Sequence, residues 1–214
     1  LFDGHDASIN IMRRMLQGSG TEVIHLGHNR SVDEIVTAAI QEDATGIAVS
    51  SYQGGHIEFF KYMIDLLRDR GAGHIRVFGG GGGVIVASEI KDLHDYGVAK
   101  IYSPEDGASM GLQGMIGDMV MRCDVDITQR GPKVLDAIQG HDAGHWRALS
   151  QLITAVEAGQ ADPDMLTAVR AASEAAHVPV VGITGTGQLR PDITEVRRLL
   201  VAQLDLRTTG KVQP

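Results

Sequence analysis

A histidine near the start of the chain could serve as a metal ligand. His5 lies in a short Asp-Gly-His run directly ahead of a segment with helical periodicity. A neutral imidazole can offer one ring nitrogen to a metal while the other donates a hydrogen bond to a carboxylate. Asp3 is placed to accept that bond, and Asp6 is an alternative acceptor. Alone, the run Asp3-Gly4-His5 is more typical of a surface turn, so the hypothesis depends on features further along.

Two later motifs favour a bulky ligand. Ser50 and Ser51 end an apolar segment, and five glycines, Gly79 to Gly83, directly follow another. Glycines let a ligand lie against the backbone, but five in a row cost considerable conformational entropy. A ligand that needs this close approach explains the run better than a loose loop does. A dinucleotide phosphate loop fits poorly, because no Gly-x-Gly-x-x-Gly with a downstream acid is present.

Composition excludes several classes of protein. The hydrophobic fraction of 43% supports a cored domain, and the net charge of −8 argues against a nucleic-acid surface. No segment is apolar for long enough to span a bilayer, and no secretory leader is visible. The single cysteine, Cys123, excludes an internal disulfide and fits a reducing compartment, so we expect a cytoplasmic protein.

The elements that must position these residues alternate between short apolar runs and amphipathic stretches. This pattern predicts an α/β fold with a doubly wound parallel sheet, whose ligand sites lie at the carboxyl ends of the strands. The predicted strands are 21–27, 46–51, 74–78 and 100–102. The predicted helices are 6–17, 32–42, 56–70, 88–96, 107–121, 142–159 and 162–176, with a linker over 124–141. A further strand over 178–183 and a helix over 192–206 are expected near the end of the chain.

Together the motifs resemble the Asp-x-His-x-x-Gly, Ser-x-Leu and Gly-Gly pattern of cobalamin-binding (B12-binding) domains of the methylmalonyl-CoA mutase family. The resemblance implies a Rossmann-like fold with His5 as the axial cobalt ligand, replacing the base of the vitamin, and Asp3 as its hydrogen-bond partner. The detached nucleotide tail would thread into a pocket beside the sheet. This chain departs from the family pattern at two positions, with Ser8 in place of Gly and Tyr52 in place of Leu. The residues implied to contact the cofactor are Asp3, Gly4, His5, Asp6, Ser8, Ile9, Ser50, Tyr52, Gly54, Gly79, Gly80, Gly81 and Ser103.

Within this family, several stretches are similar to mutases of the isobutyryl-CoA type, in which a B12 domain leads into a G-protein chaperone domain and a substrate-binding barrel. The implied cofactor is adenosylcobalamin, whose cobalt–carbon bond breaks to start a radical rearrangement of an acyl-CoA. We expect the catalytic residues to lie outside this chain and the chain to be inactive alone. The implied partners are the barrel, as domain or subunit, and a G-protein chaperone. A non-catalytic cobalamin carrier or sensor is the alternative.

The resemblance also suggests the division of the chain: a cobalamin-binding domain over 1–123, a linker and helical segment over 124–177, and a degenerate start of a P-loop domain over 178–214. The segment Gly182–Gly187 opens like a P-loop, but Pro191 and Asp192 stand where lysine and a hydroxyl are needed. We therefore expect no nucleotide hydrolysis. The family has a central strand just ahead of the histidine motif, and 178–183 is the candidate to replace it.

Four other residues whose side chains could do chemistry have simpler explanations. His25 and His28 could form a metal pair, but they lack an acid or cysteine at ligand spacing, and a hydrogen-bonded turn is the favoured interpretation. His56 is a minor candidate for contact with the ligand, because it follows two glycines. We expect Cys123 to be a buried apolar residue rather than a nucleophile.

Overall fold

The computed structural model describes residues 6–51, 54–80 and 83–175. Residues 1–172 form one compact unit, and a second unit begins at Ser173. Within the described residues the strands are β1 (Gly46–Ser50), β2 (Arg76–Gly80) and β3 (Lys100–Tyr102). The α-helices are α1 (Asp6–Gly18), α2 (Val32–Gln41), α3 (His56–Asp69), α4 (Ala87–Tyr96), α5 (Pro104–Cys123), α6 (Ala143–Glu157) and α7 (Pro163–Ala175). Two short 3-10 helices, η1 (Thr128–Arg130) and η2 (Leu135–Ile138), lie between α5 and α6.

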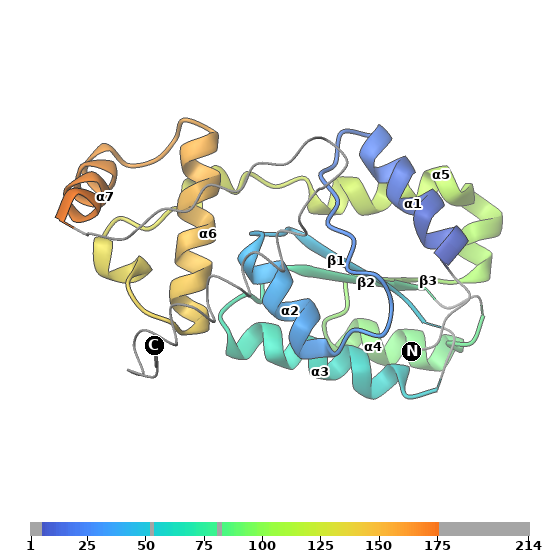
Figure 1. The fold of residues 1–214 in the computed structure, drawn as a ribbon. Coiled ribbons are helices and arrows are strands. Elements are labelled where there is room, and N and C mark those ends of the chain that lie inside the picture. Colours follow the sequence, from blue (N-terminus) through green and yellow to red (C-terminus); the bar gives the residue numbers. More distant parts are fainter. Residues whose placement is uncertain (1–5, 52–53, 81–82, 176–214) are drawn as a thin grey trace, which may run out of the picture. The chain divides into compact units, whose positions relative to one another are not determined.

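The described strands form one parallel sheet in the order β1-β2-β3. Helices α1 and α5 lie on one face, and α2, α3 and α4 lie on the other (Figure 1). This arrangement confirms the predicted α/β class, since parallel strands joined by helical crossovers need helices on both faces. The core between the sheet and the second helical layer is apolar and tightly enclosed. Its members with 1% exposure or less include Val36, Phe60, Met63, Leu67, Val77, Leu93 and Ile101.

Helix boundaries follow local capping chemistry. Ser31 caps α2: its hydroxyl accepts from the Glu34 N–H at 3.2 Å, and the Glu34 carboxylate accepts from the Ser31 N–H at 2.9 Å. Helix α5 begins at Pro104, three residues earlier than predicted, because Ser103 forms the same kind of cap and proline fits the first helical position. A break at Gly111, with φ of 66°, interrupts α5.

The strand predicted over 21–27 is wrong. These residues form no strand, and Ile24 is 51% exposed. An extended segment becomes a strand only when a neighbour supplies ladder hydrogen bonds. Among the described residues, the ladder runs only from β1 through β2 to β3. The segments predicted over 178–183 and 192–206 lie outside the described residues.

The predicted linker contains η1 and η2, and both pack against α6. Helix α6 in turn packs on α2, where the buried Ser150 hydroxyl donates to the Ile40 carbonyl at 2.8 Å. Arg147 donates to the Arg70 carbonyl at 2.8 Å. These bonds tie residues 143–157 to the sheet-bearing part of the same unit.

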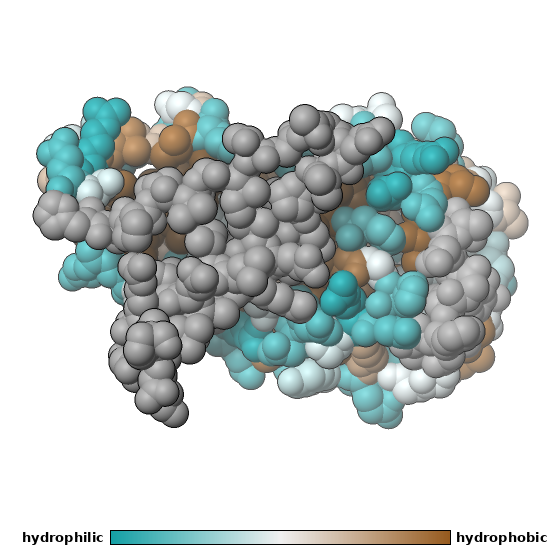
Figure 2. Space-filling model, viewed as in Figure 1, coloured by the Kyte–Doolittle hydropathy of each residue, from teal (hydrophilic) through white to brown (hydrophobic). Residues whose placement is uncertain are grey.

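The visible surface is mixed in polarity. Figure 2 shows hydrophilic residues interspersed with apolar ones over the described part of this face. The exposed apolar side chains include Ile11 at 53% and Met121 at 72%. Within the described residues, no helix combines the length and apolar character needed to cross a membrane.

Candidate functional site

Three residues from separate strands align at the carboxyl edge of the sheet. Ser50 is the register partner of Gly80, and Gly80 is the partner of Tyr102. Neighbouring strands lie about 5 Å apart, so the row spans roughly 10 Å. Ser51 extends the ladder by donating its N–H to the Gly80 carbonyl at 2.8 Å, and it is only 4% exposed. The sheet therefore brings the predicted Ser50 and Gly80 together on a fixed edge.

The two glycines at the end of β2 have different surroundings. A Cβ on Gly79 would meet Phe60 Cζ at 2.5 Å and Ile101 Cδ1 at 2.6 Å, so protein side chains fill that space. A Cβ on Gly80 would come no closer than 3.7 Å to the nearest atom, the Tyr102 carbonyl oxygen. Packing explains why β2 needs glycine at 79, whereas Gly80 leaves space at the edge.

The loop that follows β1 also presents glycines to open space. A Cβ on Gly54 or Gly55 would meet no atom within 4 Å, and Gly55 has a φ of +83°. Gly54 was predicted to contact the cofactor. With Gly80, these positions leave room for a large group at the carboxyl edge, so the described residues fit a ligand that needs close backbone approach.

Ser103 has a structural partner at this edge. Its hydroxyl accepts from the Asp106 N–H at 3.2 Å, and the Asp106 carboxylate accepts from the Ser103 N–H at 2.9 Å. Lys100 Nζ lies 3.1 Å from the same carboxylate. The Ser103 N–H, followed by Lys100, lowers the pKa of Asp106. The contact between Ser103 and the nucleotide tail stays a prediction. The Ser103 hydroxyl also caps α5.

Sequence reasoning did not identify the polar group beside the row. The Tyr102 hydroxyl donates to Asp118 Oδ2 at 2.9 Å, and Arg122 Nε donates to the same oxygen at 2.9 Å. Burial, followed by the hydrogen bond to Asp118, raises the pKa of Tyr102, so the phenol stays neutral. The signal was present in the sequence, since Asp118 and Arg122 are spaced for one helix face.

The structure also shows a contact of His56 that the sequence did not predict. His56 is 8% exposed, and its Nε2 lies 3.1 Å from Glu89 Oε2. Glu89 also accepts from the Val86 N–H at 2.9 Å. The described geometry links His56 to the start of α4. A contact with the ligand was the weaker alternative for this histidine.

The histidine motif itself is only partly described. Asp3, Gly4, His5, Tyr52 and Gly81 lie outside the described residues. Asp6 and Ser8 stand in the first turns of α1, and Ile9 is half-buried there. Helix α1 packs against α5, the helix that Ser103 caps. The proposed contacts of Asp6, Ser8 and Ile9 with a cofactor stay predictions, as do those of the five residues outside the described ranges.

The remaining candidates are His25, His28 and Cys123. His25 and His28 are exposed, and the described residues contain no group of three His, Cys, Asp or Glu that could hold a metal. Cys123 is half-buried against Gly46, whose Cβ would meet its Sγ at 2.6 Å. Burial raises the pKa of the Cys123 thiol, as expected for a packing residue.

Comparison with known proteins identifies relatives of this chain. It is 68% identical over 187 residues to fused isobutyryl-CoA mutase of Cupriavidus metallidurans, covering 87% of this chain and 17% of that protein. It is 60% identical over 194 residues to fused isobutyryl-CoA mutase of Geobacillus kaustophilus, covering 87% and 18%. It is 30% identical over 129 residues to the glutamate mutase sigma subunit of Escherichia coli O157:H7, covering 58% and 86%. The chain thus spans about a fifth of the two fused enzymes and most of the length of the sigma subunit.

The B12 binding domain model matches residues 1–110. This match contains the histidine motif, Ser50, the glycine run and Ser103, and it ends within α5. With the parallel sheet and its open carboxyl edge, it shows that the chain belongs to the B12-binding domain family.

Proposed function

We propose that this chain binds cobalamin at the carboxyl edge of its sheet as the cofactor-carrying part of an acyl-CoA mutase. The match over residues 1–110 carries the proposal, and the row Ser50, Gly80 and Tyr102 supports it. When bound, adenosylcobalamin supplies radical chemistry that rearranges a carbon skeleton. The part left to the chain is to hold the cofactor and orient it.

Each proposed residue has a task in that binding. His5 would ligate the cobalt, and Asp3 would accept the hydrogen bond from its second ring nitrogen. Gly54 and Gly80 would leave space for the nucleotide tail, because no side chain occupies those positions. The Ser50 hydroxyl would hydrogen-bond that tail. Gly4, Asp6, Ser8, Ile9, Tyr52, Gly81 and Ser103 complete the proposed contacts. Gly79 would contact the tail only through its backbone, because Phe60 and Ile101 fill the space beside it.

The substrate-handling part would be a separate domain or subunit. The relatives from Cupriavidus metallidurans and Geobacillus kaustophilus are named fused mutases. The chain is also 39% identical over 79 residues to the 2-hydroxyisobutanoyl-CoA mutase small subunit of Aquincola tertiaricarbonis. Both arrangements pair a B12-binding unit with catalytic machinery elsewhere. We therefore propose that the partner of this chain is a substrate-binding barrel. A G-protein chaperone is proposed as a second partner. The proposed location is the cytoplasm.

A cobalamin titration tests the proposal. The purified chain should bind cobalamin saturably, with the absorbance spectrum of a cofactor whose own base has left the metal. His5→Ala should lose that spectrum and bind at least tenfold more weakly, the effect expected for loss of a ligating side chain. His28→Ala, an exposed histidine on the loop before α2, is the matched control and should behave like the unmodified chain.

The outcomes separate two levels of the proposal. Unchanged affinity and spectrum in His5→Ala would show that another group ligates the metal. Lack of any saturable binding by the folded chain would reject cobalamin binding by this part alone. Activity is not the readout, because we expect no turnover without the barrel.

A further inference from the structure

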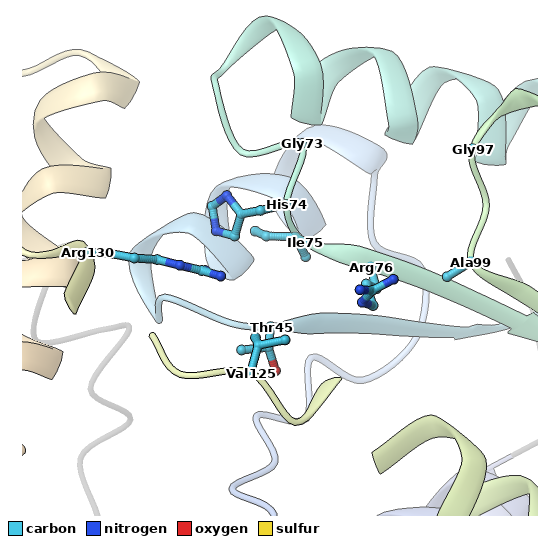
Figure 3. Close-up of a pocket in the computed structure, with 9 residues that line it drawn as sticks. All are labelled: Thr45, Gly73, His74, Ile75, Arg76, Gly97, Ala99, Val125 and Arg130. Carbon is cyan, nitrogen blue, oxygen red and sulfur yellow. The ribbon is translucent and has the colours of Figure 1, made fainter. Parts of the chain in front are cut away.

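A cavity lies at the edge of the sheet opposite the candidate cobalamin site. It has a volume of about 340 Å³ and is lined by residues at the amino ends of the strands (Figure 3). Thr45 precedes β1, Arg76 begins β2, and Ala99 precedes β3. The candidate cobalamin site uses the carboxyl ends of the same strands. The two sites are therefore separated by the length of the sheet.

The polar lining of this cavity is basic. His74, Arg76 and Arg130 come from the loop before β2, from β2 itself and from η1. Figure 3 shows the Arg130 side chain reaching across toward His74 and Thr45, while Arg76 stands at the start of its strand. The nine lining residues include neither Asp nor Glu. Two permanent positive charges thus border one cavity.

One side-chain nitrogen of Arg130 lacks a hydrogen-bond partner among the described residues. Its Nη1 is buried and has no hydrogen-bond partner within the part of the chain that the structure describes. A buried donor on a charged group carries a desolvation cost that a suitable acceptor removes. The cavity beside the guanidinium has room for such an acceptor.

Two carboxylates outside the lining interact with Arg130. Asp43 is 6% exposed and does not line the cavity; burial raises its pKa, and the charge of Arg130 opposes that rise. Asp126 accepts bonds from the N–H and hydroxyl of Thr128 at 2.9 and 2.7 Å. Burial, followed by the charge of Arg130, lowers the pKa of His74. The cavity lining itself therefore carries two permanent positive charges, those of Arg76 and Arg130.

We propose that this cavity binds a phosphate group, either as inorganic phosphate or at the end of a phosphate monoester. A tetrahedral oxyanion offers several acceptors, and the planar guanidinium fork matches two of them at once. The unpartnered Nη1 of Arg130 would donate to one oxygen, and Arg76 would neutralise the remaining charge. Thr45 and His74 border the same space and can add hydrogen bonds.

Calorimetric titration of the full chain with inorganic phosphate, and separately with glycerol phosphate, tests the site. Ionic strength is held constant with chloride. Saturable binding of one equivalent is expected, and Arg130→Gln and Arg76→Gln should each weaken it about tenfold or more, as for loss of a charge-assisted hydrogen bond. Arg170→Gln removes the same charge from an exposed position on α7 and should leave binding unchanged. Asp43→Asn should strengthen it, because a nearby negative charge is removed.

The two phosphate sources distinguish the form of the ligand. Tighter binding of the monoester would identify an organic phosphate, and equal binding would identify the free ion. Absence of saturable binding to either, or equal weakening by Arg170→Gln, would overturn the proposal. If Arg130→Gln fails to fold, Arg76→Gln decides the outcome, since Arg76 is exposed on the cavity rim.

Discussion

The Nε2 atom of His56 lies 3.1 Å from Oε2 of Glu89, and this contact joins the start of α3 to the start of α4. The same carboxylate accepts from the Val86 N–H, which lowers the pKa of Glu89 together with the bond to His56. The loops ahead of these two helices follow β1 and β2, at the edge proposed for cobalamin. A part-buried contact between two helix starts therefore fixes the spacing of α3 and α4 at the edge proposed for cobalamin.

We predict that His56→Ala lowers the free energy of unfolding by about 1–3 kcal/mol, because it removes a buried ring and an interaction of Glu89. Glu89→Gln should cost less, since the amide oxygen can still accept from Val86. Chemical denaturation of both single variants and the double variant gives the coupling energy, expected at about 0.5 kcal/mol or more. Glu58→Gln, an exposed charge change on the first turn of α3, is the control and should be close to neutral.

The same variants should also weaken cobalamin binding, because the loops would no longer be held at one spacing. The effect should appear in affinity and not in the spectrum of the bound cofactor. Strict additivity of the two stability changes would contradict the contact. A changed spectrum would instead show that His56 acts near the metal.

Gly79 and Gly80 separate the requirements of the fold from those of the ligand. Gly79→Ala should destabilise the protein by about 1–3 kcal/mol, because the new methyl would overlap Phe60 and Ile101. Gly80→Ala should leave the melting temperature nearly unchanged, since its nearest neighbour would be 3.7 Å away, but it should weaken cobalamin binding. Thermal unfolding and cobalamin titration of both variants provide the measurements. A stable Gly79→Ala protein would contradict the packing that the structure shows.

Local signals predicted much of this fold. The strand over 100–102 and the start of α2 after Ser31 match the structure, because short apolar runs and caps are set by neighbouring residues. The strand predicted over 21–27 failed because a strand needs a partner, and periodicity alone does not reveal one. The strand predicted over 74–78 begins later, at Arg76, where pairing with β1 begins.

The residues of the two sites could be predicted only where the fold class itself brings them together. Ser50 and Gly80 could be predicted to lie together, since the carboxyl ends of parallel strands share one edge. The partner of His56 lies 33 residues away on another helix, and no local pattern identifies it. Arg130 falls in a segment without periodic signals, so its place at the cavity by the amino ends of the strands depends on how η1 packs against α6.

Asp43 occupies a position that is unfavourable on two grounds. It follows the C-cap of α2 with a φ of 47°, where the Ala44 N–H donates to the Ala39 carbonyl at 2.9 Å; glycine or asparagine suits this left-handed position best. Its carboxylate is also buried, and its Oδ2 has no hydrogen-bond partner among the described residues.

We predict that Asp43→Asn stabilises the protein and that the gain grows with pH. Burial raises the pKa of Asp43 in the folded state, so the acid favours folding below its unfolded pKa of about 3.9, and that contribution is lost as the pH rises through the folded value. Asparagine carries no charge at any of these pH values. The difference in melting temperature between variant and unmodified chain should therefore be small near pH 3 and largest near neutrality. Asp124→Asn, at an exposed position, is the control and should show no comparable growth. A pH-independent difference would mean that only the backbone preference matters, and a loss of stability at neutral pH would show that the ionised carboxylate of Asp43 is needed beside Arg130.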